Sequence, residues 1–272
     1  YALDVLVELL IDGKKAPFNK VLVEEAKLTS EVGAYHYQSE LAGQFAMSVR
    51  AFASKDLNEV NKSIDAAFSR FEKNKFTQSD LDRIKVGQET DYYRSLSSVL
   101  GKGFQLAQYN LFLDNPGFIN EAVGKIQHVT ADDIWRVYNT YVKGKHYVAT
   151  SFVPKGQAAL ALKDSVKAKV VEEKIIAGAE EEVDLTKEYT YTKTPSSFDR
   201  SIEPPFGKTP EIVPPITWQA ELENGVKVLG IQNSEVPLVK VNFTVTGGVL
   251  VEEPQNNGVA NLTAQLLNRG TK

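Results

Sequence analysis

The sequence predicts an α+β fold in which an antiparallel sheet packs against helices. Apolar residues recur at helical spacing over residues 57–71, and they alternate with polar residues around residues 32–50 and again at 239–245. Strand-like and helix-like segments follow one another without strict alternation. This order favours an antiparallel arrangement over a doubly wound parallel sheet.

Residues 1–50 predict two helices followed by a β-hairpin. The apolar residues from Leu3 to Leu10 share one face of a helix, which Gly13 should end. A second, short helix is expected over residues 18–27. Beyond it, period-two patterns lie on both sides of a turn at Ser39–Gly43. We therefore expect two antiparallel strands here.

A long helical region is expected after the hairpin. The helical pattern over residues 57–71 is followed by Thr77 and Asp80, which resemble a capping box with Asp in place of the usual Glu. This pair should open a long helical segment. Gly101 and Gly103 should kink or split that segment.

Three more elements complete the first part of the chain. A helix is expected over residues 119–126, after an Asn-Pro-Gly stop signal. Thr130 with Asp133 repeats the capping pattern and should open another helix. The alternating residues 147–153 predict a strand that ends at Pro154.

Residues 155–216 are interpreted as a linker between domains. Residues 163–176 could form an amphipathic helix, and Glu180–Glu182 form a solvated charge run. The remainder is rich in proline, which predicts an extended and stiff connector. The prolines concerned are Pro195, Pro204, Pro205, Pro210, Pro214 and Pro215.

A new pattern of strands and a helix begins at Trp218. Asn224 and Gly225 predict a hairpin with a type I′ turn, in which both central residues have positive φ. The alternation over residues 239–245 is the clearest strand pattern in the chain. Residues 259–267 predict a short helix.

Composition excludes several classes of function. The net charge of −4 gives no electrostatic reason to expect nucleic acid or an anionic membrane as a partner. The chain lacks cysteine, which excludes disulfides, thiol nucleophiles and Cys-ligated zinc within it. No apolar run approaches the roughly 20 residues that a transmembrane helix needs.

The residues that could carry chemistry lack the spacing that a site requires. His36, His128 and His146 have no histidine or carboxylate in a ligand pattern three or four residues away, so we interpret them as structural or surface residues. Glu24 and Glu25 are interpreted as part of a solvated helix face, and so are Asp80 and Asp82. The tyrosines could line a peptide-binding chamber, but core packing explains most of them equally well.

Three stretches of the sequence, in this order, resemble the insulinase/pitrilysin family of zinc peptidases, which includes the mitochondrial processing peptidases. The first begins at Ala2-Leu3, runs through Asp12-Gly13 and ends at Val23. The second runs from Phe76-Thr77 to Val153-Pro154. The third runs from Trp218 through Asn224-Gly225 to Gly270-Thr271. Phe198-Asp199-Arg200-Ser201 also resembles the linker of two-domain bacterial members.

The resemblance implies a degenerate metal motif in the third stretch. The family's signature is His-x-x-Glu-His on a helix, where the two histidines bind zinc and the glutamate activates the bound water. The matching positions are Asn261, Ala264 and Gln265. Amide side chains bind zinc poorly, and alanine cannot act as a base. We therefore expect no catalytic residue, metal ligand or cofactor in this chain, and zinc elsewhere in the longer protein.

The resemblance also implies a domain organisation. Residues 1–154 are expected to form the C-terminal half of a first peptidase-like domain, residues 155–216 a linker, and residues 217–272 the start of a second, degenerate domain. Both would be LuxS/processing-peptidase-like metallopeptidase half-domains, and we expect the chain to be an internal piece. The longer protein would cleave peptide substrates inside a chamber formed by two domains.

Two other functions stay open at this point. The protein could be an inactive binding or core subunit that pairs with an active partner. It could instead be a peptide-binding or assembly module that forms homo-oligomers through exposed sheet edges. A location in the bacterial periplasm or cell envelope is expected from the linker resemblance alone.

Overall fold

The computed structural model describes residues 1–167, 169–170, 197, 199, 201–203, 205–209 and 211–267. The chain divides into two compact units, Tyr1–Val86 with Gly124–Asn233 and Gly87–Val123 with Ser234–Lys272. Each unit is described by itself. The described strands form two separate antiparallel pairs among helices. The predicted α+β class is therefore confirmed.

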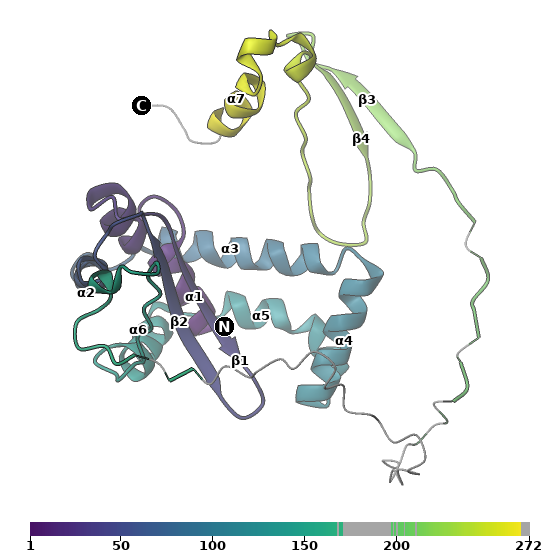
Figure 1. Ribbon diagram of the computed structural model, residues 1–272. Helices are drawn as coiled ribbons and strands as arrows, with labels where there is room; N and C mark the ends of the chain where they lie inside the picture. Colours follow the sequence, from purple (N-terminus) through teal and green to yellow (C-terminus); the bar gives the residue numbers. More distant parts are fainter. Residues whose placement is uncertain are drawn as a thin grey trace, which may run out of the picture. The chain divides into compact units, whose positions relative to one another are not determined.

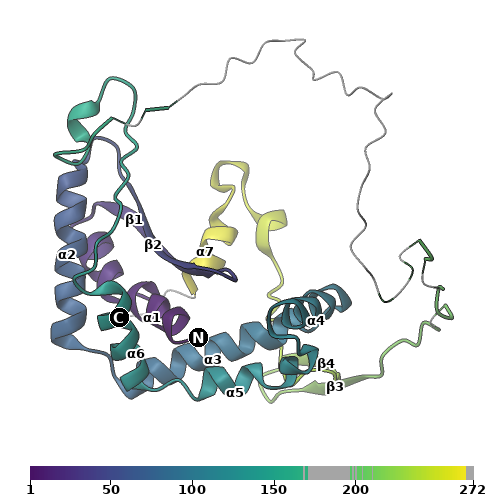
Figure 2. The same cartoon turned by 90° about the horizontal axis from the view of Figure 1, so that it is seen from below.

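Helix α1 (Ala2–Ile11) lies at the centre of the core of the first unit. It contacts strand β1 (Thr29–Gln38) and helix α6 (Ala131–Val137), as Figures 1 and 2 show. Leu6 and Leu10 are fully buried. Burying a leucine side chain stabilises a fold by about 1.5–3 kcal/mol relative to leaving it exposed. The predicted first helix is thus confirmed as a core element.

The predicted second helix is a short π-helical segment, η1 (Asn19–Glu25). Its first residue ties it to the end of α1, because the Asn19 side-chain amide donates to the Ile11 carbonyl oxygen at 2.5 Å and to the Gly13 carbonyl oxygen at 3.0 Å. These bonds satisfy carbonyl groups that lie at or beyond the end of a helix. Gly13 itself has a φ of +84°, a conformation that favours glycine.

Strand β2 (Gly43–Ala51) pairs with β1 as the alternation predicts. Val32 lies opposite Val49, and His36 lies opposite Phe45. The register is irregular between Thr29 and Val32, where the buried Thr29 hydroxyl donates to the Arg50 carbonyl oxygen at 2.8 Å. The hairpin is therefore anchored at its open end.

Helix α2 (Leu57–Asn74) brings aromatic residues to the core. Asp56 caps its N-terminus by accepting a hydrogen bond from the Asn58 backbone N–H at 2.8 Å. Near its C-terminus, the ring of Phe71 lies 5.1 Å from that of Trp135 and 5.2 Å from that of Tyr138. Such ring pairs contribute about 0.5–1.5 kcal/mol beyond their buried area.

Both predicted capping boxes form. Before α3 (Gln78–Ser95), the Asp80 carboxylate accepts from the Thr77 backbone N–H at 2.9 Å and from its hydroxyl at 2.6 Å. Before α6, Thr130 and Asp133 make the same reciprocal contacts. A π-helical turn, η3 (Tyr138–Val142), continues α6.

The long helical segment breaks before the glycines that were expected to split it. Helix α3 ends at Ser95 and α4 (Val99–Leu113) starts anew, with the Ser98 hydroxyl accepting from the Gly101 N–H at 3.0 Å. A Cβ atom at Gly101 would lie 1.9 Å from the Ser95 carbonyl oxygen. Gly101 thus permits the tight connection, whereas Gly103 lies within α4.

The helix predicted over residues 119–126 is divided. A 3-10 turn, η2 (Pro116–Asn120), precedes the short helix α5 (Ala122–Gln127). Asp114, in the left-handed region, ends α4 just before it. The stop signal was therefore placed correctly, and the following helix starts later than predicted.

Strands β3 (Thr217–Glu221) and β4 (Lys227–Ile231) form the predicted second hairpin, but its turn differs. Gly225 has a φ of +80° and donates its N–H to the Leu222 carbonyl oxygen at 2.8 Å, whereas Asn224 has no positive φ. The predicted type I′ turn is therefore wrong. A longer loop with a single left-handed glycine replaces it.

The last elements are short. Two 3-10 turns, η5 (Gly248–Val251) and η6 (Pro254–Asn256), precede helix α7 (Val259–Leu267). The helix has the bounds that the sequence predicts. Earlier in the chain, the predicted linker contains another 3-10 turn, η4 (Ala158–Leu160).

Two predicted strands are wrong. Residues 147–153 and 239–245 are all described, and they form neither helix nor strand. Phe152 and Phe243 are 92% and 89% exposed. The reason is physical, because a strand needs a neighbour for its backbone hydrogen bonds. The described strands pair only as β1 with β2 and β3 with β4.

The predicted linker is described only in part. Residues 163–167 and 169–170, at the start of the expected amphipathic helix, contain no regular helix. The rest of that helix, the charge run Glu180–Glu182 and Pro195 lie outside the described residues. Among the helices that the structure describes, none has the length and apolar character needed to cross a bilayer.

Candidate functional site

The three positions that match the degenerate metal motif lie on α7. Asn261, Ala264 and Gln265 are all exposed. Asn261 and Gln265 stand four residues apart and therefore share one helical face. Their amides and the methyl group of Ala264 offer neither the imidazoles nor the carboxylate of a hydrolytic zinc site. That these positions are a degenerate motif stays a prediction.

A carboxylate fixes the N-terminus of this helix. Glu252 accepts a hydrogen bond from the Gly258 backbone N–H at 2.8 Å and another from the Ala260 N–H. Gly258 has a φ of +104°. The negative charge lies at the positive end of the helix dipole, where it is stabilising. Glu252 is thus engaged in capping, and the sequence analysis did not identify it.

The described residues contain no cluster of three or more His, Cys, Asp or Glu side chains that could hold a metal ion. His36 Nδ1 lies 2.8 Å from the Asp4 carboxylate, which joins β1 to α1. His128 Nδ1 lies 2.5 Å from the Gly124 carbonyl oxygen, and His146 is exposed. The contacts of His36 and His128 are those of structural residues.

The acidic residues considered as candidates make pairs and caps. Glu24 lies 2.5 Å from the Lys20 ammonium group, and the Glu25 carboxylate lies 2.8 Å from the Arg70 guanidinium. The hydrogen bond from Arg70 lowers the pKa of Glu25 below its usual value. Asp82 accepts from the Gln78 side chain at 2.8 Å. These contacts agree with a solvated helix face.

The tyrosines divide between core and surface. Tyr138 is buried and donates its hydroxyl to Glu72 at 2.8 Å, while Lys143 pairs with the other oxygen of that carboxylate at 2.9 Å. Burial, together with the hydrogen bond to Glu72, raises the pKa of Tyr138 well above its ordinary value. In contrast, Tyr35 and Tyr141 are exposed. Only the exposed rings are available to a ligand.

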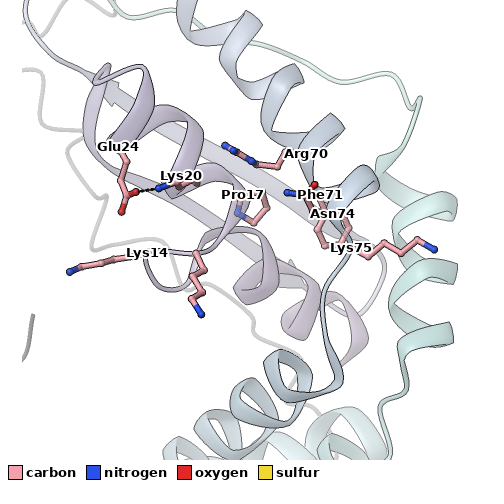
Figure 3. A pocket seen from close by; sticks show the side chains of 9 residues that line it. Lys14, Pro17, Lys20, Glu24, Arg70, Phe71, Asn74 and Lys75 are labelled. Atoms are coloured by element: carbon pink, nitrogen blue, oxygen red, sulfur yellow. Dashed lines mark hydrogen bonds and ion pairs between the residues drawn. The ribbon is translucent and has the colours of Figure 1, made fainter. Parts of the chain in front are cut away.

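A hollow with a volume of about 330 Å³ lies between η1 and the C-terminal end of α2 (Figure 3). Pro17, Phe71 and Asn74 line it together with charged side chains. One lining carboxylate, Glu24, is present, and its pair with Lys20 is drawn in Figure 3. The positively charged lining residues are Lys14, Lys15, Lys20, Arg70 and Lys75.

The sequence analysis did not identify this hollow. Its cationic residues come from the loop after α1, from η1 and from the end of α2, and only the fold brings them together. The adjacent Lys14 and Lys15 beside Pro17 were the one local signal. Lys75 enters from a left-handed backbone position, with a φ of +58°.

Comparison with known proteins finds a family model that matches the first third of the chain. Residues 1–87 match the family model described as Peptidase M16 inactive domain. The chain is also 26% identical over 142 residues to Zinc protease PqqE of Helicobacter pylori, a match that covers 52% of this chain and 32% of that protein. The chain thus spans about a third of the length of this curated relative.

Solved structures give matches of similar extent. A protease from Helicobacter pylori has a TM-score of 0.46 at 26% identity, covering 52% of this chain and 34% of that one. A putative zinc protease from Bordetella pertussis Tohama I has a TM-score of 0.47 at 18% identity, with 55% and 84% covered. The inactive peptidase domain of a putative zinc protease from Bordetella parapertussis has a TM-score of 0.44 at 17% identity, with 50% and 73% covered.

Residues 1–87 are therefore similar to a peptidase-type domain of the non-catalytic class. More particularly, these residues resemble the Peptidase M16 inactive domain, and the resemblance of the chain to insulinase-type zinc peptidases is confirmed. The division into residues 1–154, 155–216 and 217–272 stays a prediction. The two compact units are defined by contacts within the structure and say nothing about which parts of the chain are homologous domains.

Proposed function

We propose that this chain is the non-catalytic portion of a zinc metalloendopeptidase that cleaves peptides in a chamber formed by two domains. The observation that carries the proposal is the match of residues 1–87 to the Peptidase M16 inactive domain. Cleavage would require a zinc-bound water supplied by another part of the longer protein. This chain would form part of the wall of that chamber and would contact the bound peptide.

The side chains of α7 support a non-catalytic role. A zinc site that activates water needs three protein ligands and a nearby base. Asn261, Ala264 and Gln265 do not provide them at the positions that match the motif. We propose that the zinc of the longer protein is bound by residues outside this chain.

Zinc analysis of two purified proteins tests the proposal. The longer protein and the chain of residues 1–272 are dialysed together, and the metal content of each is measured by mass spectrometry. We expect about one zinc per longer chain, as in catalytic zinc sites with a single ion, and none in the 272-residue chain. The longer protein should also cleave a quenched fluorescent peptide.

The other outcomes are informative. Zinc in neither protein would contradict the peptidase proposal and favour an inactive subunit of a heteromeric enzyme. Stoichiometric zinc in the 272-residue chain would contradict the non-catalytic assignment of this chain. A chelator control that removes both zinc and cleavage from the longer protein ties the activity to the metal.

Self-association is a second candidate function, and unpaired backbone favours it. Each described hairpin has two strands and therefore two edges with free hydrogen-bonding groups. We propose that this chain forms homo-oligomers through such edges. Sedimentation velocity over a hundredfold range of concentration should show a rising sedimentation coefficient, and a single monomeric species throughout would contradict it.

We also propose a periplasmic or envelope location for the longer protein in a bacterial host. The support is the likeness of Phe198-Asp199-Arg200-Ser201 to the linker of two-domain bacterial members. Fractionation of cells by osmotic shock, followed by immunoblotting with a cytoplasmic marker as control, tests it. Recovery of the protein with that marker would refute the location.

A further inference from the structure

The sequence contains two Asn-Gly pairs, and the structure places them in different surroundings. Asn224-Gly225 lies in the loop between β3 and β4, and Asn257-Gly258 lies just before α7. Both asparagines are exposed. An Asn-Gly pair is open to deamidation, in which the backbone nitrogen that follows the asparagine attacks the side-chain carbonyl carbon. Glycine favours this attack because it has no Cβ atom to hinder the approach.

Deamidation needs no reagent other than water. The glycine nitrogen loses its proton and forms a bond to the asparagine Cγ, and the side-chain nitrogen takes up a proton and leaves as ammonia. The product is a five-membered succinimide ring. Water then opens the ring at one of its two carbonyl carbons, which gives aspartate or isoaspartate. No group is oxidised or reduced, so the reaction depends only on the access and acidity of the glycine N–H.

The loop around Asn224 leaves this reaction open. The Asn224 side-chain oxygen accepts from the Val226 N–H at 3.3 Å, a bond that turns the side chain along the peptide group of Gly225. The Gly225 N–H donates to the Leu222 carbonyl oxygen at 2.8 Å, which is a bond between neutral groups. Every residue of β3 is exposed, and a two-stranded hairpin is marginally stable in water. Local opening of the loop therefore frees the Gly225 nitrogen.

The surroundings of Asn257 oppose the same reaction. The Gly258 N–H donates to the Glu252 carboxylate at 2.8 Å, and that carboxylate also accepts from the Ala260 N–H. A hydrogen bond to an ionised acceptor is roughly twice as strong as one between neutral groups. The negative charge also opposes loss of the Gly258 proton, because the deprotonated nitrogen would carry a like charge beside the carboxylate.

We propose that Asn224 is a site of spontaneous deamidation and that Glu252 protects Asn257 from the same modification. Deamidation at Asn224 adds one negative charge to the loop, and isoaspartate also adds a methylene group to its backbone. Glu221 lies opposite Lys227 in the register directly before the loop. A longer loop disturbs this register, so the modification weakens the pairing of β3 with β4.

Peptide mapping of the aged 272-residue chain tests the proposal. The chain is incubated in mildly alkaline buffer, sampled over time and digested with trypsin, with an unincubated sample as the blank. Asn224 is the only asparagine of the tryptic peptide 209–227, so the mass increase from replacing NH by O reports this position. Tandem mass spectrometry of peptide 241–269 reports Asn257. We expect Asn224 to react at least about tenfold faster, because the bond to a charged group must break at the other site.

Unfolding in urea separates the effect of structure from that of sequence. Both Asn-Gly pairs then meet the same solvent, so their two rates should become similar. Folding should slow the reaction of Asn257 much more than that of Asn224. An Asn224 that reacts in urea but stays intact in the folded chain would overturn its assignment as a modification site. Equal rates at the two positions in the folded chain would overturn the protection of Asn257.

Neutral variants test the role of the carboxylate. Glu252→Gln keeps an oxygen that accepts the cap hydrogen bonds but removes the charge, and it should raise the rate at Asn257 at least about threefold. The rate at Asn224 should not change. The matched control is Glu253→Gln, at a carboxylate that accepts from the Gln255 side chain instead. This control should leave both rates unchanged.

Hydrogen exchange shows whether the helix persists in these variants. The amides of α7 should keep their protection in Glu252→Gln, because the neutral oxygen still caps the helix. An unchanged rate at Asn257 in Glu252→Gln, or an equal rise in Glu253→Gln, would overturn the protective role of Glu252. These readouts do not depend on zinc or on peptide cleavage.

Discussion

At the scale of single residues, the hydroxyl of the buried Tyr138 is held by a charged partner. Its ring is 1% exposed and packs on Phe71, while its hydroxyl donates to Glu72 at 2.8 Å. The Glu72 carboxylate also holds Lys143. One side chain thus joins the aromatic core to an ion pair at the surface.

Tyr138→Phe should lower the free energy of unfolding by about 1–2 kcal/mol, because a hydrogen bond to a charged group is lost while the ring stays buried. Urea denaturation followed by tryptophan fluorescence measures it, since Trp135 lies 5.9 Å from Tyr138 between ring centroids. Tyr141→Phe is the matched control at a ring that is 58% exposed. Equal losses in the two variants would refute a special role for the buried hydroxyl.

The cap at Asp133 gives a prediction of pH dependence. Hydrogen bonds from the Thr130 hydroxyl and from Arg136 lower the pKa of Asp133. A carboxyl group whose pKa is depressed by folding stabilises the fold above its unfolded pKa of about 3.9. This contribution is lost as the pH falls through the lower, folded value.

Asp133→Asn should therefore destabilise the chain by about 1 kcal/mol at neutral pH, as the loss of a helix cap does. The difference from the unmodified chain should shrink as the pH falls below about 4. Urea titrations at several pH values measure this trend. Asp132→Asn, which lies in the same first turn outside the cap, should show a smaller loss, and a difference for Asp133→Asn that persists at low pH would contradict the argument.

At the scale of elements, the connection between α3 and α4 depends on the absence of one methyl group. The Ser98 hydroxyl caps α4 through the Gly101 N–H, and the space beside Gly101 is filled by the Ser95 carbonyl oxygen. Gly103, two residues on, has no heavy atom from outside the local helix backbone within 4 Å of the position of a Cβ. A side chain is therefore excluded at Gly101 but would fit at Gly103, although both glycines lie in the same helix.

Gly101→Ala should destabilise the second unit by about 1–3 kcal/mol, the usual cost of forcing an atom into filled space. Gly103→Ala, its matched control, should stabilise it by roughly 0.5–1 kcal/mol because alanine favours helices. Hydrogen exchange of amides in α4 measures both changes locally. Similar protection in the two variants would show that the turn adapts to a side chain.

The elements that could be predicted from the sequence are those with local causes. The boxes at Thr77 and Thr130 depend on residues three positions apart, and the helix at residues 259–267 on one short apolar pattern. The strands expected at residues 147–153 and 239–245 required a distant neighbour that the described chain does not place beside them. An alternating pattern predicts which face of a strand would be buried, but it does not show which other strand would pair with it.

The same contrast applies to the candidate sites. The amides and alanine at positions 261, 264 and 265 could be identified from sequence because a metal motif on a helix has fixed spacing. The cationic hollow could not, since its lysines and Arg70 converge only after η1 packs against α2. The turn at Gly225 also differs from the one that the Asn-Gly pair predicts. Its type depends on the length of the loop between the two strands, which the Asn-Gly pair alone does not fix.

At the scale of the whole molecule, apolar side chains are buried in one part of the chain and exposed in another. Val5, Leu6 and Leu22 are fully buried, whereas Val239, Val241 and Phe243 are 91%, 66% and 89% exposed. Exposed apolar residues in an alternating segment attract another strand or sheet. The proposed self-association therefore has a specific candidate segment, residues 239–245.

Val241→Lys with Phe243→Lys should shift sedimentation toward the monomer, because charged side chains on an exposed alternating segment oppose its pairing with another copy. The apparent dissociation constant of the oligomer should rise by about tenfold or more, which corresponds to about 1.4 kcal/mol of weaker association. The matched control is Phe206→Lys, at a residue that is 91% exposed outside this segment. If the control disperses the oligomer equally, general hydrophobicity drives association. If neither variant alters it, the edges of the hairpins rather than residues 239–245 make the contact.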